Sequence, residues 1–205
     1  KSQGLRPGDP GVPAALAEPY RRYQQRLAAA QAYDYDDLLL AALEVLQNDE
    51  TVCQAARQWA THLLVDEFQD VNAVQYQLVR ALAGDGRNLF VIGDPDQAIY
   101  GFRGADHRFF AQLAADFPST TSFCLTLNYR STSTIVQAAN ALLAGANATA
   151  AQPGGQRLHY IAGNGQRAEA RAVVREIESL VGGTGMLAAD QQSGKRTARA
   201  FSLGE

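Results

Sequence analysis

Three carboxylates stand within five residues directly after the apolar run 63–65, and their types and spacing could support phosphate chemistry. Asp66 and Glu67 follow the run at once, and Asp70 comes next. A carboxylate at a strand end can hold Mg²⁺ through water, while its neighbour orients or deprotonates an attacking water. A buried strand followed by a solvated acidic turn has the same local pattern, so the acids alone leave both interpretations open.

A second polar cluster, GDPDQAIYGFRGA, occupies residues 93–105. Gln97 can donate and accept hydrogen bonds, so it could contact a phosphate oxygen and a water together. Tyr100, Phe102 and Arg103 form an aromatic-x-aromatic-Arg set, which is suited to stacking on unpaired bases and contacting a phosphate. The alternative is a loop whose two aromatic residues belong to the core.

A third cluster, LNYRS, occupies residues 127–131. Arg130 could reach the terminal phosphate of a nucleotide, and Tyr129 could stack on its base. A surface arginine beside a half-buried tyrosine is the alternative interpretation.

Alternating strands and helices are expected to position these clusters. The predicted strands are 63–66, 88–92, 122–127 and 157–161; the predicted helices are 14–32, 33–46, 50–59, 73–83, 106–117, 132–143 and 168–181. This alternation predicts an α/β fold with a parallel sheet and right-handed crossovers. Each cluster follows a predicted strand, at the edge where such sheets bind ligands. Residues 1–13, 144–155 and 182–205 are interpreted as an arm, a linker and a loop-like tail.

Composition limits the function classes. The 205 residues are 46% hydrophobic, with a net charge of −3 and a pI near 5.6, which excludes coating nucleic acid by bulk charge but leaves room for a local groove. No apolar run is long enough to span a membrane, and no signal peptide opens the chain. Cys53 and Cys124 are interpreted as small buried residues in a reducing cytoplasm. The missing initiator Met indicates an excerpt of a longer protein.

Together the three clusters resemble the UvrD/Rep/PcrA-type helicases of superfamily 1. VDEFQD at 65–70 resembles motif II (Walker B), residues 93–105 resemble motif III, and LNYRS at 127–131 resembles motif IV. The upstream YDYDDLL at 33–39 is similar to another element of that family. The resemblance covers roughly residues 14–181.

The resemblance implies a partial RecA-like P-loop NTPase fold that uses ATP and Mg²⁺. Asp66 would hold the metal, and Glu67 would activate the water that attacks the γ-phosphate. Gln97 would link the nucleotide to a DNA groove in which Tyr100 and Phe102 stack on single-stranded bases.

The remaining roles follow from the same resemblance. Arg103 would contact DNA or tie its loop to neighbouring carboxylates, and Phe102 replaces a Trp that many relatives carry. Tyr129 would stack on adenine, and Arg130 would act as an arginine finger. Asp70 is expected to serve the local turn and helix start instead of chemistry.

The implied domains are the end of an accessory domain (1–31), the second half of a first motor domain (32–127) and the start of a second (128–205). A phosphate loop of the form G-x-x-x-x-G-K-[ST] does not occur in the sequence. Its only Gly-Lys pair is Gly194-Lys195, and Arg196 follows where Ser or Thr is required. We therefore expect a parent helicase or translocase that acts on single-stranded DNA and duplex junctions in cytoplasmic repair or replication, whereas this chain alone is inactive.

Three alternatives remain open at this point. One is a helicase subunit of a RecB/AddA-type recombination nuclease. Another is a non-hydrolysing module derived from a helicase, although Asp66, Glu67, Gln97 and Arg130 would then have no chemical purpose. The third is an unrelated α/β nucleotide-binding domain, which would leave the aromatic residues of 93–105 without a role.

Overall fold

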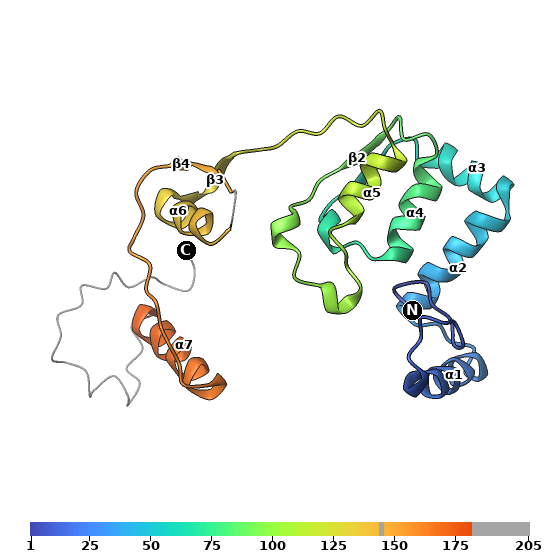
Figure 1. The fold of residues 1–205 in the computed structure, drawn as a ribbon, viewed down its shortest axis with the longest axis horizontal. Helices are drawn as coiled ribbons and strands as arrows, with labels where there is room; N and C mark the ends of the chain where they lie inside the picture. The colour runs from blue at the N-terminus through green and yellow to red at the C-terminus, as the bar shows by residue number, and fades with distance from the viewer. Residues whose placement is uncertain (144–145, 182–205) are drawn as a thin grey trace. The chain divides into compact units, whose positions relative to one another are not determined.

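The computed structural model describes residues 1–143 and 146–181, which divide into two units at Cys124 and Leu125. The predicted tail 182–205 lies outside the described residues. The helices are α1 (Ala14–Ala29), α2 (Tyr35–Asn48), α3 (Glu50–Trp59), α4 (Ala73–Ala83), α5 (Phe109–Asp116), α6 (Ser133–Leu142) and α7 (Gln166–Val181). The strands are β1 (Leu63–Val65), β2 (Leu89–Val91), β3 (Leu127–Thr132) and β4 (Thr149–Gln152), and Figure 1 shows the order along the chain.

The first unit is built on a short parallel sheet. Strands β1 and β2 pair in parallel with Leu64 opposite Phe90. Helix α4 packs against α2 and α3, which follow one another along the chain (Figure 1). Arg57 of α3 donates from Nε to the carbonyl of Ala81 at 2.8 Å, which joins α3 to the end of α4.

The core of this unit gathers around the residue that follows the acidic pair. Phe68 is fully buried, and its ring meets the ring of Phe110 edge-on at 5.0 Å. Tyr76 of α4 stacks on Phe109 of α5 at 4.7 Å, and its hydroxyl donates to Asp116 at 2.7 Å. These contacts hold α4 and α5 beside β1. Residues 66–70, which follow β1, therefore lie against a well-packed core.

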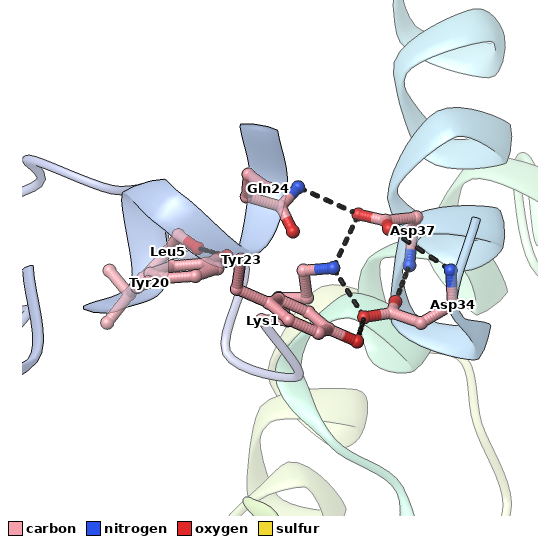
Figure 2. A network of polar contacts seen from close by, with 7 residues as sticks. All are labelled: Lys1, Leu5, Tyr20, Tyr23, Gln24, Asp34 and Asp37. Carbon is pink, nitrogen blue, oxygen red and sulfur yellow. Dashed lines mark hydrogen bonds and ion pairs between the residues drawn. The ribbon is translucent and has the colours of Figure 1, made fainter. Parts of the chain in front are cut away.

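A polar network joins the first residues of the chain to the start of α2 (Figure 2). Asp34 caps α2 by accepting the Asp37 N–H, and Asp37 accepts the Asp34 N–H in return, a capping box. The largely buried Nζ of Lys1 lies 2.5 Å from Asp34 Oδ2 and 2.7 Å from Asp37 Oδ1. Tyr23 and Gln24 of α1 donate to the same two carboxylates, so the network ties the arm, α1 and α2 together.

The second unit contains another parallel pair, β3 with β4, and α6 packs against both strands. The described strands thus form two separate two-stranded sheets, and one continuous sheet is not seen among them. The mixed α/β class and the parallel pairing are confirmed.

Two predicted strands were wrong. The third was expected at 122–127, but β3 begins at Leu127, and Phe123 and Leu125 before it are strongly exposed. The fourth was expected at 157–161, but that segment has no regular structure, and β4 lies in the stretch interpreted as a linker. Strand formation depends more on a hydrogen-bonding partner than on β-propensity. Here the small residues 149–152 form the strand that pairs with β3.

The cysteine prediction was half right. Cys53 is buried on α3, as expected for a small apolar residue, but Cys124 is exposed at the boundary of the two units. No helix in the described ranges is long and apolar enough to cross a membrane.

Candidate functional site

The acidic segment, residues 66–70, begins where β1 ends. Asp66 and Glu67 are both exposed, and Asp66 Oδ1 accepts the backbone N–H of Glu67 at 2.9 Å. Glu67 has φ 51° and ψ 44°, the left-handed region that non-glycine residues rarely adopt. This turn leaves the Glu67 carboxylate at the surface while Phe68 enters the core, where its N–H donates to the Ile92 carbonyl at 3.0 Å.

Gln69 joins the acidic segment to the next loop along the sheet edge. Its side chain is only 2% exposed, and its Nε2 donates to Glu67 Oε2 at 2.5 Å. Its Oε1 accepts the backbone N–H of Asp94 at 3.0 Å. Sequence reasoning gave Gln69 no role. The sequence feature that could have indicated a role is a neutral amide two residues after a candidate base, in a segment that turns into the core.

Gly93 must be glycine for this approach to occur. A Cβ built there would lie 2.8 Å from Gln69 Oε1, 2.8 Å from Phe110 Cζ and 2.9 Å from the Phe68 backbone nitrogen. Such distances are shorter than real Cβ contacts, so the backbone after β2 can touch the acidic segment only without a side chain.

The aromatic loop, residues 93–105, leaves β2 at the same edge. Asp94 begins a 3₁₀ turn and accepts the Asp96 N–H, while Gln97 donates from Nε2 to Asp94 Oδ2 at 2.7 Å. Gln97 itself is exposed. The capping aspartate thus holds the glutamine side chain near the point where the loop starts.

The aromatic side chains of this loop form an exposed cluster. The rings of Tyr100 and Phe102 lie 6.0 Å apart, and Phe102 is 82% exposed. The Arg103 guanidinium lies over both rings, 5.3 Å and 5.8 Å from their centroids. The alternative of two core aromatics is therefore wrong for Phe102 and Tyr100, since both rings are open to solvent.

An ion pair follows directly after the aromatic loop. Arg108 and Asp106 pair through Nε and Nη2, the latter 2.5 Å from Asp106 Oδ2. Hydrogen bonds from the Arg108 side chain and backbone lower the pKa of Asp106 to about 2. Ala105 also forms an antiparallel bridge with Asn72, which caps α4. Both ends of the loop are thus fixed, and the aromatic cluster lies between them.

Asp70 has a smaller part than its neighbours. It lies in the 3₁₀ turn Phe68–Asp70, and its N–H donates to the Glu67 carbonyl. The expected place in the local turn is confirmed, but α4 is capped by Asn72 through a capping box with Gln75, so Asp70 does not serve the helix start.

The third cluster belongs to the second unit and lies within β3, where it was expected to follow a strand. Asn128 Oδ1 accepts the N–H groups of Arg130 and Ser131 at 3.0 and 2.8 Å. Tyr129 is 71% exposed and not half-buried, and its carbonyl accepts Nε2 of Gln152 from β4. Arg130 is exposed as well, so both side chains are open to a ligand.

The structure therefore brings together the first two clusters. Parallel strands β1 and β2 end at one edge, with Asp66 and Glu67 after β1 and the aromatic loop after β2. Comparison with known proteins identifies the family of the chain that forms this edge. The UvrD/REP helicase N-terminal domain family matches residues 10–118.

The chain belongs to the UvrD/REP helicase family.

Two named relatives show how much of the family's length is covered. The chain is 41% identical over 196 residues to the ATP-dependent DNA helicase UvrD1 of Mycobacterium tuberculosis, which covers 88% of this chain and 25% of the relative. It is 36% identical over 168 residues to the ATP-dependent DNA helicase PcrA of Staphylococcus aureus, which covers 79% of this chain and 23% of the relative. The chain thus spans about a quarter of the length of these UvrD/REP helicases.

The carboxylates at this edge of the UvrD/REP chain fit one kind of metal site. In the described part of the chain, no group of three or more His, Cys, Asp or Glu side chains could hold a metal ion. Mg²⁺ does not need such a cage, because it keeps several waters and takes one or two carboxylates plus substrate phosphates. Asp66, exposed and oriented by the Glu67 N–H, fits that single-carboxylate role.

Proposed function

We propose that this chain is part of an ATP-dependent DNA helicase or translocase that couples ATP hydrolysis to movement on single-stranded DNA. The observation that carries the proposal is the shared edge of β1 and β2, where an acidic pair adjoins a loop with an exposed aromatic cluster. A nucleotide site and a base-stacking site side by side are what a DNA-driven ATPase requires. Membership of the UvrD/REP helicase family supports it.

The proposed roles in hydrolysis fall to four residues. Asp66 would hold Mg²⁺, which when bound neutralises charge on the phosphate oxygens. Glu67 would accept the proton of the attacking water, since its carboxylate stands at the surface beside Asp66. Arg130 would stabilise charge on the γ-phosphate, and Tyr129 would stack on the adenine.

The same proposal includes a domain organisation. It places RecA-like motor domains at 32–127 and 128–205, after an accessory domain that ends at 31.

The proposed roles in DNA binding fall to the aromatic loop. Exposed rings that carry an arginine over their faces suit bases, because every base has a face to stack on and the guanidinium can reach a phosphate. Tyr100, Phe102 and Arg103 have this arrangement. Gln97, hydrogen-bonded to Asp94 at the start of the loop, would relate the nucleotide to the DNA.

Glu67→Gln in the complete protein tests the proposal. We expect DNA-stimulated ATP turnover to fall by about 10²–10⁴-fold, the usual contribution of a positioned base, while ATP binding persists. Glu44→Gln is the matched control, because Glu44 lies in an exposed pair with Arg6. A complete protein that binds ATP and DNA without turnover would favour the non-hydrolysing module instead. Nuclease activity in the same protein would favour the RecB/AddA type.

The 205-residue chain by itself is proposed to hydrolyse nothing. No sequence in it supplies the backbone N–H groups and lysine of a phosphate loop, the usual cradle of the β- and γ-phosphates. ATP turnover by this chain with and without single-stranded DNA is the measurement. Stimulated hydrolysis that Glu67→Gln abolishes would overturn the proposal. DNA repair or replication in the cytoplasm is the proposed setting, with single-stranded DNA and duplex junctions as substrates.

A further inference from the structure

The buried amide of Gln69 uses both of its ends on functional loops. Its Nε2 donates to Glu67 Oε2 at 2.5 Å, and its Oε1 accepts from the Asp94 backbone at 3.0 Å. At 2% exposure the side chain has almost no access to water that could replace either partner. A buried amide is costly unless it is paired, so these two hydrogen bonds fix its orientation.

The two bonds belong to a longer series. Gln97 donates from Nε2 to Asp94 Oδ2 at 2.7 Å, at the residue whose N–H Gln69 accepts. Hydrogen bonds and one residue of backbone therefore connect the Glu67 carboxylate, through Gln69 and Asp94, to Gln97. The series runs from the proposed base to the loop that carries the aromatic cluster.

The surroundings leave Gln69 little freedom to move alone. Phe68 on one side is fully buried, and its N–H is bonded to the Ile92 carbonyl. On the other side, Gly93 approaches so closely that a Cβ there would lie 2.8 Å from Gln69 Oε1. A shift of the chain at Gly93 and Asp94 must therefore act on the Gln69 amide, and through it on Glu67.

We propose that Gln69 is a positioning residue that aims the Glu67 carboxylate and couples it to the aromatic loop. Holding Oε2 of Glu67 fixes the direction in which its other oxygen can accept a proton. Binding of single-stranded DNA to the aromatic loop acts on Asp94, and Gln69 transmits that change to the carboxylate. This inference rests on the proposed ATPase function and adds a route for its stimulation by DNA.

Two substitutions separate the bonds. Gln69→Met keeps the approximate length of the side chain and removes both hydrogen bonds. Gln69→Glu keeps an oxygen for the Asp94 N–H and replaces the amide donor with a carboxyl group, which loses its donor to Glu67 when it ionises. Gln77→Leu is the control, because Gln77 is an exposed glutamine on α4 of the same unit. The measurements are kcat and KM for ATP in the complete protein, with and without single-stranded DNA, and the thermal midpoint of each variant.

Both Gln69 variants are expected to lower the DNA-stimulated kcat by about 10–100-fold. That is the range for residues that orient a functional side chain at a metal site through a hydrogen bond. The KM for ATP should stay within about twofold, because Gln69 is not placed to bind the nucleotide, and Gln77→Leu should match the wild type in both. If Gln69→Met does not fold, Gln69→Glu carries the test, since it retains the contact with Asp94.

Three outcomes would contradict the inference or its basis. Stimulated kcat values within about twofold of wild type in both folded variants would overturn it. A full rate in Gln69→Glu up to the highest pH at which the variant stays folded, with a loss only in Gln69→Met, would show that Gln69 anchors the loop and does not aim Glu67. A wild-type protein without DNA-stimulated turnover would instead overturn the proposed function itself.

Discussion

The Nζ of Lys1 lies 2.5 Å from Oδ2 of Asp34, and the same carboxylate accepts the hydroxyl of Tyr23 and the N–H of Asp37 (Figure 2). Burial raises the pKa of Asp34, but these hydrogen bonds and the Lys1 charge outweigh it and lower the pKa from 3.8 to about 2. One carboxylate therefore caps a helix and anchors the arm.

Asp34 should make the stability of this chain depend on acid. Its folded pKa lies below its unfolded one, so its contribution is complete above about pH 4 and disappears as the pH falls through about 2. Asp34→Asn keeps a good N-cap residue but removes the charge, and we expect it to cost about 1–2 kcal/mol at pH 6. Urea unfolding at pH 6 and pH 2 measures the difference, which should be much smaller at pH 2, where Asp34 is about half protonated in the folded state.

Asp36→Asn is the matched control for that measurement, because Asp36 lies in the first turn of the same helix and the Lys1 ion pairs go to Asp34 and Asp37. It should cost only a few tenths of a kcal/mol through the helix dipole. Equal losses for the two variants at pH 6 would show that the Lys1 network adds nothing to Asp34.

Tyr76 should stabilise the core of the first unit through its hydroxyl as well as its ring. Burial and the hydrogen bond to Asp116 raise its pKa, and the hydroxyl donates to a carboxylate that Arg80 also contacts. We expect Tyr76→Phe to lower the free energy of unfolding by about 1.5–3 kcal/mol, the range for hydrogen bonds to charged groups. Denaturant unfolding measures it, with Tyr33→Phe, at a 69% exposed tyrosine, as the control. A loss no larger than that of Tyr33→Phe would count against the bond.

The sequence predicted the elements of the first unit better than those of the second. In the first, apolar runs such as 63–65 are bounded by turn residues and pair as strands, so the local pattern and the strand pairing agree. The run 63–65 is nevertheless covered on one face only, because Leu64 is 72% exposed. In the second, the segment 157–161 has the residue types of a strand but pairs with no strand among the described residues. Its Leu158 and Tyr160 are both exposed. Pairing partners were decided by tertiary structure, which local pattern does not encode.

The candidate site was predicted in part for a similar reason. Exposed polar residues after strands, such as Glu67 and Gln97, were visible because they stand in polar segments that follow apolar runs. Gln69 was missed because its role depends on being buried between two loops that are distant in sequence. The position of Tyr129 and Arg130 was misplaced by the error in the third strand.

Gly93→Ala should disturb the contact between the two loops. The added Cβ would lie 2.9 Å from the Phe68 backbone nitrogen, an atom that cannot rotate away, so the backbone must shift. We expect a loss of about 1–3 kcal/mol in the free energy of unfolding, typical of overpacking. Gly101→Ala is the control in the same loop, because a Cβ there meets nothing within 4 Å. Similar unfolding midpoints for both variants would rule out the tight approach at Gly93.

Phe102 should contribute binding energy to single-stranded DNA in the complete protein. It is 82% exposed and lies in the cluster with Tyr100 and Arg103, so its loss removes a stacking surface without opening a cavity. Phe102→Ala should weaken binding by about 1–3 kcal/mol, the range for one stacked base, while Phe102→Trp, which restores the larger ring, should retain or strengthen it.

Fluorescence anisotropy with a labelled oligonucleotide at fixed salt measures both Phe102 variants. Phe123→Ala is the matched control, because Phe123 is equally exposed, at 83%, but lies outside the aromatic loop. If Phe102→Ala and Phe123→Ala weaken binding equally, the aromatic loop is not the DNA contact. An effect confined to Phe102→Ala, with unchanged ATP affinity, separates the stacking surface from the nucleotide site, because the aromatic rings lie beyond the turn that holds Gln97.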